Sequence, residues 1–235
     1  MKNLAIITAR GGSKRIPKKN IKEFCGKPII AYSIEAALNS GIFDEVMVST
    51  DSQNIAEIAK QYGAKVPFMR SEETSNDFAT TLDVLKEVIS TYQKMDKTFE
   101  YFTCIYPTAP FITSEKLKDA AGKLYASDAD SIVSVVGFGF PPQRALIMKE
   151  GKLAFQYPEY ALRRSQDLEP IYHDCGQFYI CKTQSFLEKG ALFTSNTIPY
   201  VIPDEEVQDI DTMSDWIIAE AKYTVLQRIR EGKDV

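Results

Sequence analysis

The sequence predicts an α/β fold in which one domain, residues 1–235, is built on a mostly parallel sheet. Through the first half of the chain, short β-rich runs alternate with segments whose apolar residues recur at helical spacing. Such alternation is typical of right-handed strand–helix–strand units with helices on both faces of the sheet. The composition agrees, because 44% of the 235 residues are hydrophobic and 26% are charged, as in ordinary globular proteins.

The predicted elements follow one another along the chain. Residues 4–8 form an apolar run with a β-branched end at Thr8 and predict a buried strand. Residues 28–40 carry helical apolar spacing that ends at Gly41, a residue favoured just after a helix. Ser52 and Asn54 open a second helix, which runs to Tyr62 before Gly63. Further strands are expected at 45–50, 66–69, 101–106 and 131–136, and further helices over 81–92 and 114–126.

Three segments that follow predicted strands should border one crevice. Residues 9–20 follow the first strand, Asp51 follows the second, and residues 106–110 follow a later one. Ligands of open α/β sheets bind beyond the carboxyl ends of the parallel strands. We therefore expect the functional site where these three segments meet.

Residues 138–172 interrupt the alternation and predict an insertion. Two runs, 144–148 and 152–157, indicate a hairpin around Glu150-Gly151. We expect an arm that packs on a second subunit; the alternative is a long surface loop. A strand at 176–181 then returns to the sheet, and the segments 201–202 and 208–210 precede a C-terminal helix over 214–228.

Composition also excludes several classes of protein. The net charge of −4 argues against broad nucleic-acid binding, which needs a basic face. Four scattered cysteines and a single histidine do not make a zinc site. The apolar run near the N-terminus is too short for a signal peptide, and no stretch of the sequence approaches a membrane span. A cytoplasmic protein that does not bind membranes is therefore expected.

The segment 9–20, ARGGSKRIPKKN, is the most informative part of the sequence. Adjacent glycines follow a buried strand and let backbone N–H groups approach an anion, and five cations stand within ten residues. Arginine and lysine give charge-assisted hydrogen bonds to phosphate, so a nucleoside triphosphate is indicated; a solvated charged turn is the alternative. The motifs GxxxxGK[ST] and GxGxxG are absent, so the segment is neither a P-loop nor a dinucleotide fingerprint.

Asp209 and Asp211 form a second group of candidate ligands. At positions i and i+2 of an extended segment, both carboxylates leave the same face and suit a divalent cation. The alternative is a role at the start of the terminal helix, where Thr212 and Asp215 resemble a capping box. His173, the only histidine, lies before a predicted strand and suits a ligand contact rather than acid–base work.

Five segments match one family in order between about residues 4 and 220: residues 9–20, GKP at 26–28, VSTD at 48–51, YPTAP at 106–110 and QDIDT at 208–212. Together they resemble the cytidylyltransferases of nine-carbon acidic sugars, relatives of CMP-N-acetylneuraminate synthetase. Among these, the chain is most similar to members that act on pseudaminic acid. The details are Tyr106 after Ile105, the stretch RSQDL at 164–168, and His173 where sialic acid enzymes tend to have arginine.

The resemblance implies a single Rossmann-like nucleotidyltransferase domain with a β-rich dimerisation arm at about 138–172. It implies catalytic roles for Arg10, Lys14, Lys19 and Asp211, and Mg²⁺ binding by Asp209 and Asp211. It places the sugar beside Tyr106, His173 and Gln177. The residues that it implies at the CTP are Ala9, Arg10, Gly11, Gly12, Ser13, Lys14, Lys19, Asn20, Arg70, Thr80 and Thr81.

The implied reaction is condensation of CTP with a nonulosonic acid, pseudaminic acid foremost, to give a CMP-sugar and pyrophosphate. N-acetylneuraminate and legionaminate are the alternative sugars, and a homodimer is the implied assembly. An alternative of another class is a nucleotide-binding protein that kept the sheet and lost catalysis. The presence of Arg10, Lys14, Asp209 and Asp211 argues against that alternative.

Overall fold

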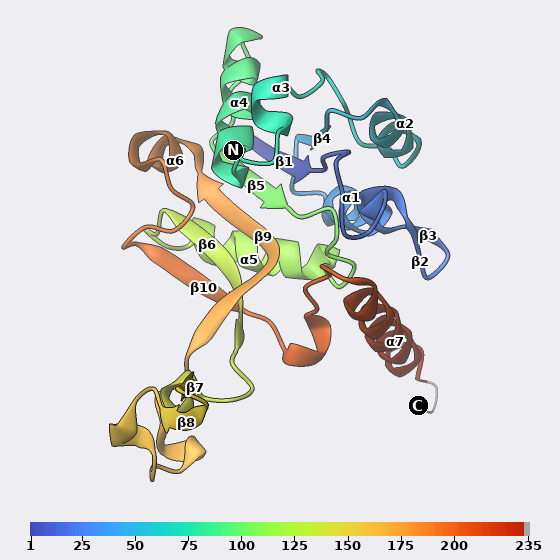
Figure 1. Ribbon diagram of the computed structural model, residues 1–235. Helices are drawn as coiled ribbons and strands as arrows, with labels where there is room; N and C mark the ends of the chain where they lie inside the picture. Colours follow the sequence, from blue (N-terminus) through green and yellow to red (C-terminus); the bar gives the residue numbers. More distant parts are fainter. Residues whose placement is uncertain (233–235) are drawn as a thin grey trace.

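A computed structural model describes residues 1–232 of the chain. Its main sheet has six strands in the order β10-β6-β9-β5-β1-β4 (Figure 1). The strands are β1 Asn3–Thr8, β4 Glu45–Ser49, β5 Tyr101–Ile105, β6 Ser131–Gly137, β9 Tyr172–Lys182 and β10 Thr197–Val201. Only β9 runs antiparallel to its neighbours β5 and β6, so the predicted α/β class with a mostly parallel sheet is confirmed.

Helices cover both faces of the sheet, because the apolar side chains of β1 point alternately to one face and to the other. Ala5 and Ile7 face a core with α1 Ile29–Ser40, α2 Gln53–Gln61 and α5 Ser114–Tyr125. Leu4 and Ile6 face a second core with α4 Thr81–Lys94 and α6 Thr183–Lys189. The period-two alternation of a strand thus gives the sheet two buried faces.

The C-terminal helix, α7 Met213–Arg230, packs outside these layers. Its Trp216 lies in a third apolar cluster with Ile16, Phe24 and Ile210, beside the short pair β2 Glu23–Phe24 and β3 Lys27–Pro28. Ile16 and Ile210 come from distant parts of the sequence. The cluster therefore brings the segment after β1 against the segment before α7.

The insertion forms a separate arm. Its hairpin, β7 Leu146–Lys149 and β8 Lys152–Phe155, turns at Glu150 and Gly151, both at positive φ as a two-residue hairpin turn requires. Figure 1 shows the arm in yellow, held away from the main sheet by the ends of β6 and β9. Short 3-10 helices flank the hairpin at Pro142–Arg144, Pro158–Tyr160 and Ser165–Asp167.

The remaining predictions of local structure are confirmed apart from one strand and a few short elements. The strand predicted at 66–69 does not form. The preceding residue, Lys65, makes a single bridge to Met47, and the ladder stops there because Pro67 has no N–H to continue it. The helices α6 and α3 Glu72–Ser75 were not predicted, nor was the pair of β2 and β3. The sequence singled out only residues 201–202 where β10 forms, so this strand was not predicted either. None of the helices within residues 1–232 is long and apolar enough to cross a bilayer.

Candidate active site

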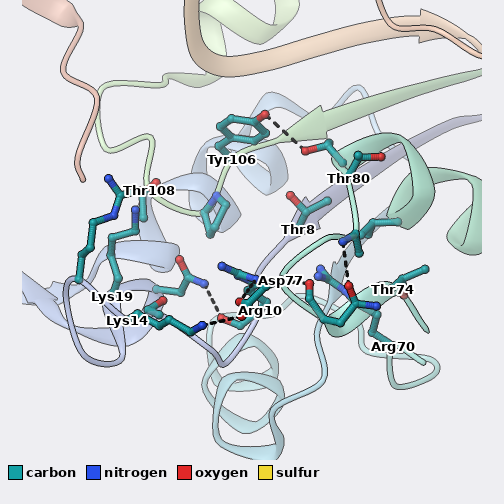
Figure 2. A pocket seen from close by; sticks show the side chains of 18 of the residues that line it. Thr8, Arg10, Lys14, Lys19, Arg70, Thr74, Asp77, Thr80, Tyr106 and Thr108 are labelled. Carbon is teal, nitrogen blue, oxygen red and sulfur yellow. Dashed lines mark hydrogen bonds and ion pairs between the residues drawn. The ribbon is translucent and has the colours of Figure 1, made fainter. Parts of the chain in front are cut away.

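A pocket of about 510 Å³ opens at the carboxyl ends of β1 and β5. It gathers ten of the residues that the sequence pointed to, from segments up to two hundred positions apart (Figure 2). They are Arg10, Ser13, Lys14, Lys19, Asn20, Arg70, Thr80, Thr81, Tyr106 and Asp211. Other expected residues do not line it: Ala9, Gly11, Gly12, Asp51, His173, Gln177 and Asp209.

Asp51 supports the glycine loop instead of bordering the pocket. The Gly11 N–H donates to Asp51 Oδ1 at 2.8 Å, and the Ala9 N–H donates to the Ser49 carbonyl at 3.0 Å. A Cβ at Gly11 would lie 3.1 Å from the Ser52 Cβ, a closeness that glycine permits. The end of β4 therefore fixes where the loop leaves β1. The expectation that Asp51 borders the crevice itself was wrong.

Four cations of the loop reach two carboxylates. Arg10 Nη1 lies 3.1 Å from Asp77 Oδ1, and Lys14 Nζ lies 2.5 Å from Asp77 Oδ2. On the other side, Arg15 Nη2 lies 2.8 Å from Asp211 Oδ1 and Lys19 Nζ lies 3.7 Å from the same oxygen. The result is a concentrated set of charge-assisted donors suited to a polyphosphate.

Sequence reasoning missed Asp77 as a site residue. It stands between β4 and α4, outside every motif quoted above, and no local spacing links it to the loop. It also missed Asn76, Thr8, Thr74 and Thr108 as residues that line the pocket. Arg15 was counted among the cations but not assigned to the site.

Asn20 and Arg70 are buried in the pocket wall, at 5% and 8% exposure. Asn20 Nδ2 donates to the Arg10 carbonyl at 2.9 Å. Arg70 donates through Nε to Ser49 Oγ at 3.0 Å and through Nη2 to the Ser49 carbonyl at 2.6 Å. Burial lowers the pKa of Arg70, and the charge of Asp51 opposes that effect. Arg70 is thus fixed on β4 and presents a positive charge from a partly dehydrated position.

Tyr106 forms the other end of the pocket, beyond the cations in Figure 2. Its hydroxyl lies 3.5 Å from Thr81 Oγ1, and burial raises its pKa. A bulge in β9 makes room for its ring: Gly176 has φ +63°, and a Cβ there would lie 3.4 Å from Tyr106 Cδ2. Behind the ring, Tyr179 donates to Asp174 Oδ2 at 2.5 Å.

Gln177 and His173 lie outside the lining. Gln177 is 3% exposed; its backbone carbonyl accepts from the Tyr106 N–H at 3.0 Å, and its Nε2 donates to the Glu206 carbonyl at 2.7 Å. His173 is exposed at the base of the arm, with its ring 4.7 Å from that of Phe138. Gln177 therefore supports Tyr106 from behind, whereas His173 belongs to the junction with the arm.

Asp209 and Asp211 flank Ile210, which is buried in one cluster with Trp216. Only Asp211 reaches the pocket, while Asp209 is exposed. The described residues contain no group of three or more histidine, cysteine or acidic side chains that could hold a metal by itself. One carboxylate beside a polyphosphate site nonetheless fits Mg²⁺, which takes few protein ligands and completes its shell with phosphate oxygens and water.

The alternative proposed for this segment is also realised. Thr212 Oγ1 accepts from the Asp215 N–H at 3.3 Å, and Asp215 Oδ2 accepts from the Thr212 N–H at 2.7 Å. This is the predicted capping box of α7. The Asp211 N–H also donates to Asp215 Oδ2, at 3.1 Å. The cap therefore sets the direction in which the chain leaves Asp211.

Comparison with known proteins gives consistent results. Residues 4–206 match the family described as cytidylyltransferase. The chain is 42% identical over 226 residues to the pseudaminic acid cytidylyltransferase of Campylobacter jejuni, covering 96% of this chain and 97% of that one. It is 36% identical to the CMP-N,N'-diacetyllegionaminic acid synthase of Legionella pneumophila, covering 94% of this chain and 95% of that one.

Two further relatives extend the comparison. The N-acylneuraminate cytidylyltransferase of Streptococcus agalactiae is 35% identical, over 92% of this chain and 52% of that one. A solved CMP:2-keto-3-deoxy-manno-octonic acid synthetase, in complex with CTP, superimposes with a TM-score of 0.70 at 17% identity, covering 97% of this chain and all of that one. At that identity the last comparison supports the fold alone.

Proposed function

The chain belongs to the cytidylyltransferase family, and we propose that it condenses CTP with a nonulosonic acid, pseudaminic acid foremost, to give a CMP-sugar and pyrophosphate. The observation that carries the proposal is the pocket beyond β1 and β5, where loop cations, buried Arg70 and Asp211 meet. Relatives named for legionaminic and N-acylneuraminic acids keep those sugars as the alternatives. The alternative of another class, a nucleotide-binding protein without catalysis, predicts CTP binding with no release of pyrophosphate.

We assign the triphosphate of CTP to the cations Arg10, Lys14 and Lys19, with the backbone of the loop 9–13 beside them. Asn20 and Arg70 are assigned to the cytosine, and the hydroxyls of Thr80 and Thr81 to the neighbourhood of the nucleotide. In support, the side chains of Arg10, Lys14, Lys19, Asn20, Arg70, Thr80 and Thr81 share one pocket. The N–H groups of Ala9 and Gly11 are engaged by the Ser49 carbonyl and Asp51 Oδ1, so the role proposed for these two residues is to hold the loop in place.

The sugar is assigned to the end of the pocket that Tyr106 forms. Gln177 supports Tyr106 through a backbone hydrogen bond, and its own Nε2 is engaged by Glu206. The proposal for His173 rests on its match to the family's pattern rather than on the pocket, because the ring packs on Phe138. A test of His173 therefore also tests whether the base of the arm belongs to the sugar site.

In the proposed reaction, the anomeric hydroxyl of the sugar acid attacks the α-phosphorus of CTP. A P–O bond to the sugar forms, the bond to the bridging oxygen of pyrophosphate breaks, and the hydroxyl proton passes to water. Negative charge grows on the phosphate oxygens in the transition state, so fixed cations stabilise it more than the ground state. Arg10, Lys14 and Lys19 would supply that stabilisation.

Mg²⁺ is proposed as the cofactor, held by Asp211 with Asp209 as its companion. When bound, it would neutralise phosphate charge and favour ionisation of the attacking hydroxyl. The protein's own contribution is to hold the Asp211 carboxylate in the pocket, beside Arg15 and Lys19. The cap of α7 and the burial of Ile210 fix that placement.

The assembly is proposed to be a homodimer formed through residues 138–172. The support is the exposure of large apolar side chains on the arm: Phe140 is 92% exposed, Met148 75% and Leu162 99%. Exposed apolar groups gathered on one projection mark an interaction surface. Two copies that exchange arms would cover both patches with one two-fold axis.

A cytoplasmic location is proposed as well. All four cysteines are free thiols, and Cys104, Cys175 and Cys181 are buried without a disulfide. A reducing compartment keeps thiols in this state. Cell fractionation with a periplasmic marker would test the location.

The decisive experiment is an assay of pyrophosphate release with CTP and Mg²⁺, run separately with pseudaminic acid, N-acetylneuraminic acid and a legionaminic acid. We expect release with pseudaminic acid at the highest kcat/KM. Release with N-acetylneuraminate alone would overturn the assignment of the sugar. Absence of release with every acid would overturn the proposed activity.

A further inference from the structure

The Asp77 carboxylate is bound to two of the cations that the proposed function assigns to phosphate. Each of its oxygens meets a different cation: Oδ1 lies 3.1 Å from Arg10 Nη1 and Oδ2 lies 2.5 Å from Lys14 Nζ (Figure 2). The Lys14 hydrogen bond and charge, followed by Arg10, lower the pKa of Asp77, so it is ionised at neutral pH. A negative oxygen pair thus occupies donors of the polyphosphate site.

A turn built by Asn76 presents Asp77 to the loop. Asn76 Oδ1 accepts from the N–H groups of Phe78 and Ala79 at 2.8 and 3.0 Å, and its Nδ2 donates to the Glu73 carbonyl at 2.7 Å. The Asn76 carbonyl also accepts from Arg10 Nη1 at 3.4 Å. Hydrogen bonds within the segment just before α4 therefore hold the Asp77 carboxylate near the loop cations.

The same segment is poorly covered. The Asp77 side chain is 47% exposed and Phe78 is 93% exposed. The ion pairs are therefore weak and screened by salt, unlike a buried pair. A carboxylate held this loosely can be displaced by a phosphate group, which offers more charge and more acceptor oxygens to the same donors.

We propose that Asp77 competes with the phosphate groups of CTP and of pyrophosphate for Arg10 and Lys14, weakening polyphosphate binding and promoting release of pyrophosphate. The inference rests on the proposed function, because it takes the loop 9–20 to be the triphosphate site. Asp77 would then oppose polyphosphate binding, whereas Arg10 and Lys14 favour it. A site of four cations would otherwise retain the highly charged product.

The test is the binding of inorganic pyrophosphate to the full-length chain without sugar, followed by isothermal titration calorimetry. Asp77→Asn removes the competing charge and is expected to lower the dissociation constant by about three- to tenfold, the scale of two exposed ion pairs. The inhibition constant of pyrophosphate against CTP should fall by a similar factor. The difference from wild type should shrink as KCl is raised, because the competition is electrostatic.

Glu73→Gln is the matched control, since it removes one negative charge from the same exposed segment at a side chain outside the pocket lining. It should leave the dissociation constant nearly unchanged. Asp77→Ala is a second variant, which removes the charge without introducing an amide and should act in the same direction as Asp77→Asn.

Equal or weaker pyrophosphate binding by both Asp77 variants would overturn the inference while leaving the proposed function intact. An equal gain in the Glu73→Gln control would also overturn it, because general charge would then explain the effect. Absence of pyrophosphate and CTP binding in the wild type would overturn the inference together with the proposed function.

Discussion

At the residue scale, the pocket combines one carboxylate that the sequence pointed to with another that it did not. Asp211 and Asp77 each hold two different cations of the loop. Chemically they are alike, yet we assign them opposite roles: Asp211 would bind Mg²⁺ with the substrate, whereas Asp77 would give way to it. Single substitutions distinguish these roles.

The first prediction concerns Asp211. Asp211→Asn should lower kcat by about a hundredfold at saturating Mg²⁺, the scale of losing one electrostatic contact to the transition state. Asp209→Asn should cost less, because Asp209 does not line the pocket. Steady-state pyrophosphate release measures both variants. Unchanged turnover in Asp211→Asn would show that this aspartate is not a metal ligand.

The second prediction concerns Arg70, which is 8% exposed and bonded twice to Ser49. Arg70→Lys keeps the charge and loses the planar fork, so the KM for CTP should rise about tenfold. Arg228→Lys, on the exposed end of α7, is the matched control and should change nothing. If the KM for CTP were the same in all three proteins, Arg70 would have no contact with the nucleotide.

At the element scale, the start of α7 links stability to the site. Its capping box fixes the chain direction at Asp211, and its Trp216 packs on Ile16 from the loop. The end of β4 likewise positions site residues, since the Ser49 carbonyl accepts hydrogen bonds from the Ala9 N–H and from Arg70 Nη2. Elements that support the fold therefore also place the functional groups.

The third prediction tests the cap. Thr212→Ala removes the side chain that accepts from the Asp215 N–H and should lower the free energy of unfolding by about 1 kcal/mol. Ser214→Ala, two positions further on the exposed side of the helix, is the control and should stay within about 0.5 kcal/mol. Urea unfolding followed by circular dichroism gives both values. A loss of equal size in the control would contradict the assignment of the cap.

The fourth prediction concerns Glu45 on β4, which is 7% exposed. Burial alone would raise its pKa, but hydrogen bonds from Tyr92, Lys65 and Lys97 outweigh burial and lower the pKa below 4.5. A carboxylate with a depressed folded-state pKa stabilises the protein above its unfolded-state value, and the stabilisation is lost as pH falls through the folded-state value. The free energy of unfolding should therefore decline as pH falls below about 4.5.

The variant Glu45→Gln isolates this contribution. Its free energy of unfolding should depend less on pH between neutrality and acid than that of the wild type, because one titrating group is gone. Tyr92→Phe keeps the ring and the carboxylate but removes the hydrogen bond of 2.5 Å, so it should show an intermediate slope. Parallel pH profiles for wild type and Glu45→Gln would refute the role of Glu45.

At the scale of the whole molecule, the arm is separate from the sheet that carries the pocket (Figure 1). Large apolar groups that the arm leaves exposed are unusual for a protein acting alone. β9 connects the two regions, since His173 lies at its arm end and Tyr179, whose ring contacts that of Tyr106, lies further along the strand. One strand, β9, therefore joins the proposed dimer interface to the proposed sugar end of the pocket.

The fifth prediction tests the assembly. The wild type should sediment as a dimer at micromolar concentration, and Leu162→Asp should shift it toward monomer, because a charge would be buried in the interface. Leu187→Asp, at a 44% exposed leucine on α6, is the control and should remain dimeric. A monomeric wild type in sedimentation velocity would refute dimerisation through the arm.

The sequence alone determined the local structure wherever one pattern dominated. The alternation of strands and helices, the glycine after α1, the hairpin at Glu150-Gly151 and the capping box of Thr212 all depend on near neighbours, and all appear as expected. The family was likewise readable, because motifs such as the one at 9–20 are recognisable from their own residues, and residues 4–206 match the cytidylyltransferase family. The strand at 66–69 failed because Pro67 outweighed its β-rich neighbours.

Only the tertiary structure decided which of these groups meet. Asp77 and Lys14 lie 63 positions apart, and Lys19 and the Ile210 carbonyl lie 191 apart, so no local spacing could pair them. Asp51 accepts a hydrogen bond from the loop, and Asp209 lies outside the pocket. His173 packs on Phe138 at the base of the arm. Side-chain identity fixes what a residue can do, whereas packing between distant elements fixes what it can reach.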